Sequence, residues 1–308
     1  DMNVPKIKNE AEYQTIRDFL RPVMISFMEC KNVLLQGVLF QNSPAWNLHP
    51  LLCENVIVEG VTVRNPAYAV NGDGIDLESC KNSLIINSSF DVGDDGICIK
   101  SGKDEDGRKR GRACENLIVD NCTVFKGHGG FVVGSEMSGG VKNMKVTNCQ
   151  FLGTDVGLRF KSKRGRGGVV ENIFVENIGM LDIVTEPLLF DLYYMNKSAS
   201  EAMNDPVTGD RIVPKKDVTT PTFRNIHIKN IRASNVNRAM YFNGLPENPI
   251  EGIYVEDAKI TARKGAELKE STKIILKNID IIPESGPAVK ISNCTDLKLE
   301  NVSGEIVK

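Results

Sequence analysis

Short alternations of apolar and polar residues recur along most of the chain. A nine-residue stretch that starts with Asn, or with a residue in its place, and then alternates apolar with other side chains occurs ten times. Clear copies are NVLLQGVLF from Asn32, NVIVEGVTV from Asn55, NLIVDNCTV from Asn116 and NIFVENIGM from Asn172. Alternation with a period of two predicts a β-strand with one buried face. Each copy therefore predicts a short strand.

The spacing of the copies predicts how these strands are arranged. Successive copies begin 21 to 34 residues apart, except for one step of 53 residues between Asn172 and Asn225. This length suits one coil of a parallel β-helix, and the copies lack the fixed leucine frame of leucine-rich repeats. We therefore predict an all-β chain that forms a single parallel β-helix domain over residues 1–308. Insertions are expected at 102–113 and 196–222, and the 53-residue step leaves room for an extra coil.

Asparagine and cysteine hold fixed places in the repeat. Asn begins seven of the ten copies. It tolerates the left-handed backbone of a turn, and its amide can hydrogen-bond to the same residue in the next coil. Cys30, Cys53, Cys80 and Cys114 each stand two residues before the first position of a copy. We therefore expect stacked Asn side chains and buried free thiols, with neither disulfides nor a zinc site.

A second strand in each coil carries the polar residues of a candidate site. Its copies are GDGIDLES (72–79), DDGICIKS (94–101), HGGFVVGS (128–135) and DVGLRFKS (155–162). Aligned on their shared glycine, they place Asp73 and Asp95 at the same position of adjacent coils. Neighbouring strands lie about 4.8 Å apart. The two carboxylates are therefore expected to stand side by side.

Other charged residues fall close to this pair. Asp94 adjoins Asp95, and His128 takes the position of Asp94 one coil further on. Arg159 and Lys161 follow about 10 Å from Asp95 by the same strand spacing. Crowded carboxylates raise at least one pKa, which supplies the acid and the base that glycosidic cleavage needs. Arg and Lys on the same face suit a substrate that carries carboxylates.

The second and fourth residues after the aligned glycine are expected to face solvent. They include Asp76 and Lys100, and the segment AWNLHP places His49 on the same face one coil earlier. Asp76 is expected to order the site. Stacked aspartates can also cap turns or bind calcium, but three acids, a histidine and an Arg/Lys pair in one register favour a catalytic site.

Four motifs resemble the signatures of a known enzyme family. NGDGID, GDDGI, GHGG and RFK, in this order and spacing, resemble those of glycoside hydrolase family 28, the polygalacturonases. SGKDEDGRKRGR and GSEMSGGVKN are similar to stretches of bacterial exo-acting members. The resemblance implies a right-handed parallel β-helix that hydrolyses α-1,4-linked galacturonate in pectin with inversion. Gly72 departs from the pattern, because many members carry Thr there.

The resemblance also implies a role for each catalytic residue. Asp94 corresponds to the general acid, and Asp73 and Asp95 correspond to the pair that activates water. His128 corresponds to the residue that supports protonation of the acid.

A second set of residues is expected to bind the substrate. Arg159 and Lys161 correspond to the residues that hold a galacturonate carboxylate, and the family's site tyrosine aligns with Tyr194 or with the adjacent Tyr193. The predicted substrate-binding residues are Arg159, Lys161, Tyr194, His49 and Lys100.

Several alternatives stay open at this stage. Insertions 102–113 and 162–168 could wall off one end of a groove, which favours an exo-acting enzyme over an endo-acting one. Rhamnogalacturonan and xylogalacturonan are alternative substrates on the same scaffold. A calcium-dependent pectate lyase and a carbohydrate-binding β-helix are further alternatives, although neither needs three acids in one register.

The composition of the chain limits which partners and locations are expected. The formal net charge is -2, so no basic field favours nucleic acid, and the chain has no run of 18 apolar residues that could span a membrane. We expect a monomer without cofactor or metal that acts on a pectic polysaccharide or oligogalacturonide. A secreted or periplasmic location is expected, although no signal peptide is visible. The start of the chain within the family pattern suggests that amino-terminal coils are missing.

Overall fold

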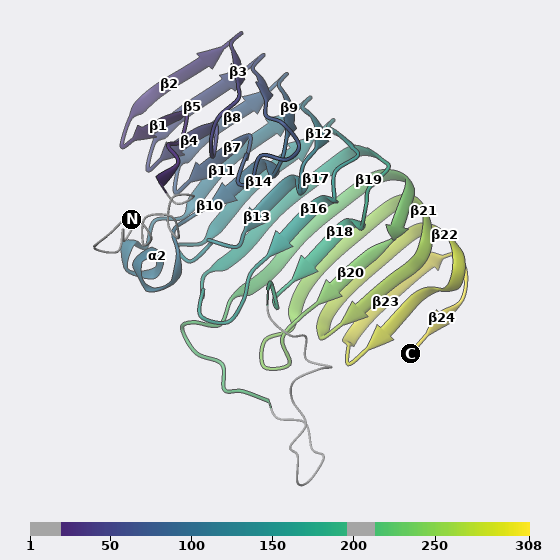
Figure 1. Ribbon diagram of the computed structural model, residues 1–308. Helices are drawn as coiled ribbons and strands as arrows, with labels where there is room; N and C mark the ends of the chain where they lie inside the picture. The colour runs from purple at the N-terminus through teal and green to yellow at the C-terminus, as the bar shows by residue number, and fades with distance from the viewer. Residues whose placement is uncertain (1–19, 196–212) are drawn as a thin grey trace, which may run out of the picture.

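Parallel strands stacked coil upon coil make up the molecule (Figure 1). The computed structural model describes residues 20–195 and 213–308. In the described part, every pairing between named strands is parallel. Most strands pair with the strand one coil before and the strand one coil after, as β10 does with β7 and β13. This arrangement confirms the predicted parallel β-helix.

The strands form three ladders along the stack. The first ladder contains β1 (Ile25–Met28), β4 (Leu48–Leu51), β7 (Ile75–Glu78), β10 (Asp95–Lys100), β13 (Gly129–Gly134), β16 (Val156–Lys161), β18 (Glu186–Asp191), β20 (Met240–Asn243) and β24 (Ile306–Val307). The second contains β2 (Lys31–Gln36), β5 (Glu54–Glu59), β8 (Lys81–Ile86), β11 (Cys114–Asp120) and β14 (Val141–Thr147). The third contains β3 (Leu39–Gln41), β6 (Thr62–Arg64), β9 (Ser89–Val92), β12 (Thr123–Lys126) and β15 (Gln150–Leu152).

Strands nearer the carboxyl terminus run without a break from one ladder into the next. These long strands are β17 (Val169–Leu181), β19 (Thr222–Arg238), β21 (Ile250–Lys269), β22 (Ser271–Ser292) and β23 (Thr295–Val302). The first part of each continues the second ladder, as the pairing of β14 with β17 and of β17 with β19 shows. The final parts of β21 and β22 continue the first ladder beyond β20.

Asparagine side chains stack at the turn before the second ladder, as predicted. Asn55 Nδ2 donates to Asn32 Oδ1 at 2.9 Å, and Asn225 Nδ2 donates to Asn172 Oδ1 at 2.6 Å. The φ angles of these four residues lie between 53° and 59°, in the left-handed region that Asn tolerates. The contact between Asn172 and Asn225 joins adjacent coils. The suggestion of an extra coil within the 53-residue step is therefore wrong, because β17 pairs directly with β19.

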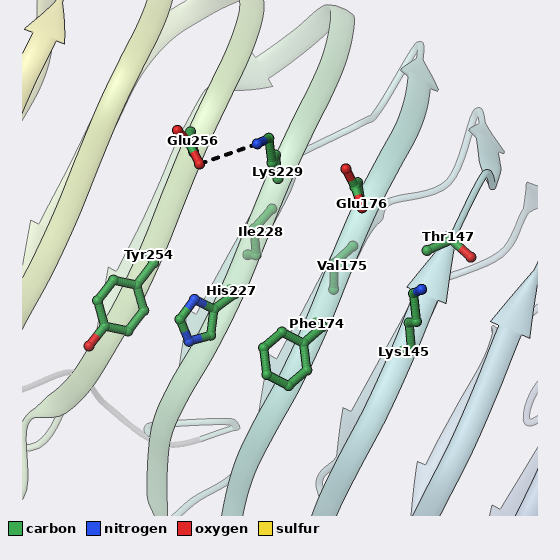
Figure 2. Close-up of a pocket in the computed structure, with 10 residues that line it drawn as sticks. All are labelled: Lys145, Thr147, Phe174, Val175, Glu176, His227, Ile228, Lys229, Tyr254 and Glu256. Atoms are coloured by element: carbon green, nitrogen blue, oxygen red, sulfur yellow. Dashed lines mark ion pairs between the residues drawn. The ribbon is translucent and has the colours of Figure 1, made fainter.

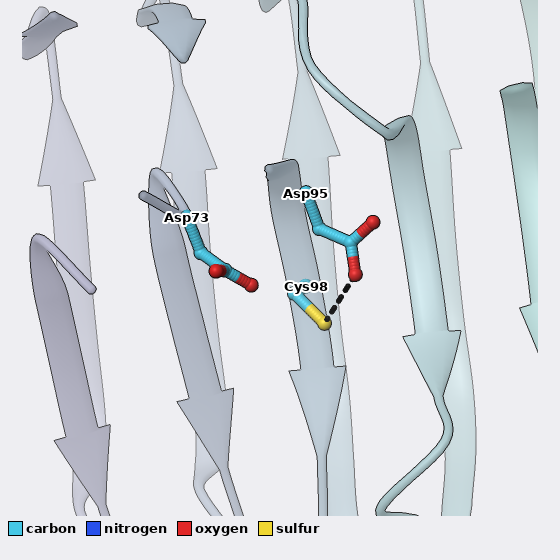
Figure 3. Close-up of side chains that lie close together, drawn as sticks. All are labelled: Asp73, Asp95 and Cys98. Carbon is cyan, nitrogen blue, oxygen red and sulfur yellow. Dashed lines mark hydrogen bonds between the residues drawn. The ribbon is translucent and has the colours of Figure 1, made fainter. Parts of the chain in front are cut away.

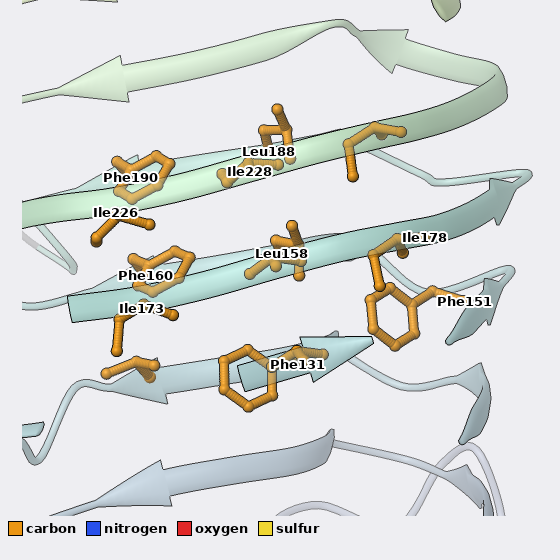
Figure 4. Packing of buried hydrophobic residues seen from close by; sticks show 14 of the residues in the cluster. Phe131, Phe151, Leu158, Phe160, Ile173, Ile178, Leu188, Phe190, Ile226 and Ile228 are labelled. Atoms are coloured by element: carbon orange, nitrogen blue, oxygen red, sulfur yellow. The ribbon is translucent and has the colours of Figure 1, made fainter. Parts of the chain in front are cut away.

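The interior of the stack is filled by aligned apolar side chains (Figure 4). The rings of Phe160 and Phe190, from β16 and β18, stack with centroids 4.6 Å apart. All eight cysteines are free, and Cys53, Cys80 and Cys114 are completely buried. This agrees with the expected buried thiols.

The insertion at 102–113 forms a helix, where the sequence analysis expected only a loop. Helix α2 (Asp104–Arg110) has three acidic residues in its first turn and three basic residues in its last turn, which match the helix dipole. Gly111 ends it with a φ of 58°. Within the described ranges, no helix is long and apolar enough to cross a bilayer. Of the insertion at 196–222, the structure describes only residues 213–222.

Candidate active site

Asp73 and Asp95 lie side by side at the start of first-ladder strands (Figure 3). The register of β7 and β10 pairs Ile75 with Ile97, which places the two aspartates at equivalent positions. A carboxylate oxygen of each lies within 4.8 Å of the other and of the Cys98 sulfur. The predicted pair of adjacent carboxylates is confirmed.

The aligned glycines let the turn before each first-ladder strand lie against the core. A Cβ atom on Gly96 would meet a methyl group of Val124 at 2.5 Å, and one on Gly130 would meet the Phe151 ring at 2.4 Å. Only glycine fits at these two positions without displacing the core. The aligned glycines therefore set where each first-ladder strand begins and where the acids project.

Asp94 and His128 occupy the predicted equivalent positions. The His128 backbone N–H donates to the Asp94 carbonyl oxygen at 3.0 Å, and Asp95 is paired with Gly129. Asp94 Oδ1 accepts a hydrogen bond from the Asp95 backbone N–H at 2.9 Å. His128 Nδ1 lies 2.5 Å from Asp155 Oδ2. The sequence analysis missed Asp155, although it opens the segment that contains Arg159.

Arg159 and Lys161 form ion pairs with Asp95. Lys161 Nζ lies 2.6 Å from Asp95 Oδ2, and Arg159 Nη1 lies 3.2 Å from Asp95 Oδ1. The sequence predicted the approach of the two cations, but it did not predict that they would hold one of the acids. Arg159 Nε is buried without a hydrogen-bond partner among the described residues.

The two equivalent aspartates differ in protonation. Burial raises the pKa of Asp73 well above its usual range, and the charges of Asp76 and Asp94 raise it further. Burial also raises the pKa of Asp95, but Lys161 and Arg159 outweigh that effect and lower it to about 2. The pKa values of the two adjacent carboxyl groups are therefore shifted in opposite directions, which favours the protonated form at Asp73 and the ionised form at Asp95.

The outer face of the first ladder is buried here, contrary to the expectation that it faces solvent. Asp76 has no exposed surface, and Lys100 is 5% exposed. Lys100 Nζ lies 3.4 Å from Asp76 and 3.2 Å from Glu136, while Arg166 pairs with the other oxygen of Glu136. Burial raises the pKa of Asp76 to about 7, even though Lys100 acts to lower it. Covering side chains and the segments after β13 and β16 exclude water from this face.

Trp46 and its neighbours close the amino-terminal side of the acid cluster. The Lys100 ammonium lies 5.0 Å from the centre of the Trp46 ring, and the His49 ring meets Trp46 edge-on at 5.0 Å. His49 Nε2 lies 3.2 Å from Glu78, which also pairs with Arg110 of α2 at 2.9 Å. His49 and Lys100, both predicted to bind substrate, are therefore held in a closed network.

Tyr194 is the tyrosine that lies beside the cationic pair. The centre of its ring lies 5.1 Å from Lys161 Nζ and 5.7 Å from the Arg159 guanidinium carbon. Tyr193 is buried and lies next to Arg164. The geometry therefore favours Tyr194 over Tyr193 as the site tyrosine.

The group formed by Asp73, Asp95 and Cys98 does not suit a metal ion. Its carboxylate and sulfur atoms are close enough to be ligands. However, Lys161 and Arg159 already neutralise Asp95, and burial raises the pKa of the Cys98 thiol well above its usual range. A dication would have to displace these cations and deprotonate a buried thiol, which opposes binding.

A separate cavity of about 210 Å³ lies on the outer face of the second ladder (Figure 2). Phe174, His227 and Tyr254 line it from successive coils. Their rings stack on one another, with centroids 5.1 Å and 4.3 Å apart. Because the three rings cover one another's faces, few ring faces are free to stack on a sugar. This cavity belongs to a different ladder from the acid cluster.

The fold and the acid cluster together define a parallel β-helix protein with adjacent carboxylates and two cations on one ladder. The chain belongs to glycosyl hydrolases family 28, whose sequence profile matches residues 12–280. The family prediction is therefore confirmed.

Individual relatives agree with this assignment. A "Probable polygalacturonase" of Vitis vinifera is 29% identical over 79% of this chain and 47% of its own length. An "Endo-polygalacturonase" of Pectobacterium carotovorum subsp. carotovorum is 34% identical over 65% of this chain and 46% of its own. The crystal structure of an exopolygalacturonase from Thermotoga maritima, 33% identical, superposes with a TM-score of 0.71 over 85% of this chain and 55% of that one. The chain thus spans about half the length of these relatives.

Proposed function

We propose that the protein hydrolyses α-1,4-galacturonosyl linkages in pectin with inversion. The observation that carries the proposal is the convergence of Asp73, Asp94, Asp95, Arg159 and Lys161 from successive first-ladder coils. The relatives named above as polygalacturonases support the substrate class. Pectin is a polymer of the plant cell wall, so we expect a secreted or periplasmic enzyme that acts as a monomer.

The spacing of the carboxylates supports a division of roles. The acid and base of an inverting glycosidase stand about 6.5–9.5 Å apart, with a water between substrate and base. Asp73 and Asp95 approach within 4.8 Å, so they form one group that orients water. Asp95 accepts the proton of the attacking water, while Asp73, whose pKa is raised by burial, holds that water by a hydrogen bond. Asp94 is then the third carboxylate, which donates a proton to the leaving oxygen as the glycosidic C–O bond breaks.

Arg159, Lys161 and Tyr194 form the proposed contact with a galacturonate carboxylate. The Arg159 side chain is 17% exposed, and a carboxylate fits the planar fork of a guanidinium. The Tyr194 ring stands beside both cations and offers an apolar surface to the sugar. The proximity of His128 to Asp94 and its pairing with Asp155 support its role in maintaining the proton on the acid.

We favour exo action over endo action. Trp46, His49 and Lys100 fill the outer face within one to two coils of Asp73, and α2 is tied to them through Arg110. A chain that reaches Asp94 from the carboxyl-terminal side would end against this network. Rhamnogalacturonan is the second candidate substrate, because Arg159 and Lys161 require only one uronate. A product profile discriminates these: monomer alone from polygalacturonate, with rhamnogalacturonan untouched, supports the exo-polygalacturonase.

The Asp94→Asn variant tests the reaction itself. We expect kcat on polygalacturonate to fall by about 10²- to 10⁴-fold, because the leaving oxygen loses its proton donor. Binding of oligogalacturonide, measured by calorimetry, should persist. The control is Asp91→Asn, which removes the same charge three residues away on β9 and should keep wild-type turnover. Retained turnover in Asp94→Asn would overturn the assignment.

A further inference from the structure

A second charged cavity lies on the same corner of the stack as the acid cluster. It has a volume of about 340 Å³ and is lined by Arg238, Lys264, Glu267, Ser285 and Lys290, among others. It belongs to the coils of β20, β21 and β22, which follow β10, β13, β16 and β18 along the first ladder (Figure 1). The proposed reaction assigns it no role.

The strand register places this cavity in the same row of equivalent positions as Asp95. Asp95 is level with Gly129, Val156 is paired with Glu186, and Arg238 is paired with Lys264. The pairing of Phe131 with Leu158 aligns Gly129 with Val156, and the pairing of Leu188 with Met240 aligns Glu186 with Arg238. These positions form one row across the strands. Lys264 therefore stands five strands beyond Asp95, about 24 Å away at the usual strand spacing.

The charge along this row changes sign between its two ends. Asp73 and Asp95 lie at one end, and Arg238, Lys264 and Lys290 lie at the other. Arg238 is neutralised, because it pairs with Glu186 and with Glu267.

The two lysines differ from Arg238 in forming no close ion pair with the described residues. Lys264 and Lys290 are exposed, and neither forms an ion pair within 4.0 Å of any residue in 20–195 or 213–308, although Lys290 lies beside Glu267 and helps to lower its pKa. The cavity therefore offers two ammonium groups that are not held in close ion pairs with the described chain.

We propose that this cavity is a remote subsite for a uronate carboxylate of the same chain that is cleaved at Asp94. The proposal rests on the proposed function, because the ligand is a galacturonan. One sugar ring of an extended chain covers a distance comparable to one strand spacing. A chain laid along the row would thus bring a carboxylate to Lys264 and Lys290 about five sugars from the cleaved bond. Arg238, stacked on the Tyr241 ring at 3.8 Å, forms the wall between the subsite and the reaction centre.

The double variant Lys264→Gln/Lys290→Gln tests the subsite. We expect the KM for an octagalacturonide to rise about threefold to tenfold, with kcat unchanged, because two exposed charge contacts are lost. The KM for a trigalacturonide should not change, because that substrate cannot span the distance. Equal effects on both substrates, or no effect on either, would overturn the proposal.

A matched control removes the same charge from other faces. Lys145 and Lys259 lie on the outer faces of the second and third ladders, so Lys145→Gln/Lys259→Gln should leave both KM values unchanged. A rise in the octagalacturonide KM of this control would show a general charge effect and count against the subsite.

Direct binding separates this proposal from the assigned reaction. If the wild-type protein binds octagalacturonide but does not hydrolyse it, the proposed function fails. In that case, weaker binding of the octamer by the double variant than by the wild type supports the subsite, and equal binding overturns it. If the wild type binds no octamer, both are overturned.

Discussion

The first ladder has a closed side, in the coils of the acid cluster, and an open side, nearer the carboxyl terminus. On the closed side, Lys100 is 5% exposed and is held between Asp76, Glu136 and the Trp46 ring. On the open side, Lys264 and Lys290 stand exposed around a cavity. Buried ion pairs make a rigid contact, because breaking a pair leaves an uncompensated charge. Solvated charges make a weak contact that a mobile polyanion can form and release.

The largest expected effect comes from removing a charge on the closed side. Lys100→Met leaves the buried Asp76 without its cation, while Glu136 keeps Arg166, so we expect the free energy of unfolding to fall by about 3–5 kcal/mol. Lys145→Met, which removes an exposed lysine, should change it by less than about 0.5 kcal/mol. Urea unfolding of both variants measures the difference. A loss of similar size in the two would show that the closed network is not stabilising.

A smaller, pH-dependent effect is expected at Asp76. Burial raises its pKa from 3.8 to about 7, so the fold favours its protonated form. The stability from this group is complete below pH 3.8 and is lost as the pH rises towards 7. Asn cannot ionise, so the free energy of unfolding of Asp76→Asn should rise relative to that of the wild type as the pH increases from about 4 to about 7.5. Asp280→Asn, at an exposed ion pair with Lys259, serves as the control. A stability difference for Asp76→Asn that does not change with pH would contradict the expectation.

The smallest effect should appear on the open side. Raising the ionic strength from about 0.05 to 0.5 M screens exposed charges but hardly affects buried pairs. We expect the KM for octagalacturonide to rise by about threefold, with a much smaller change for trigalacturonide. In Lys264→Gln/Lys290→Gln this difference between substrates should shrink. Parallel salt titrations of the initial rates provide the measurement, and identical salt slopes for both substrates would place the sensitivity elsewhere.

The sequence predicted those features that depend on register. Alternation and repeat length were enough for the parallel β-helix, and the aligned glycines were enough to set Asp73 beside Asp95. His128 and Arg159 followed from the same alignment. A stack translates one coil onto the next, so sequence position converts almost directly into spatial position.

Features that depend on neighbouring segments could not be predicted in this way. The alternation of apolar and polar residues predicts which side of its strand Asp76 occupies. It does not predict that Trp46 and the segments after β13 and β16 cover that side. The opposite pKa shifts of Asp73 and Asp95 arise from Lys161, which alignment placed only approximately. Helix α2 was missed because seven residues are too few for a clear 3.6-residue pattern.

The assembly of the site from successive coils limits how the stack can change in length. Each coil meets only its two neighbours, so a duplicated coil beyond β20 would shift the later coils and leave the acid cluster as it is. The same duplication between β10 and β16 would move Lys161 away from Asp95 by one strand spacing and break their ion pair. A coil inserted between β7 and β10 would likewise separate Asp73 from Asp95. The scaffold can therefore gain or lose coils outside the stretch from β7 to β16, but within it the number of coils is determined by the chemistry.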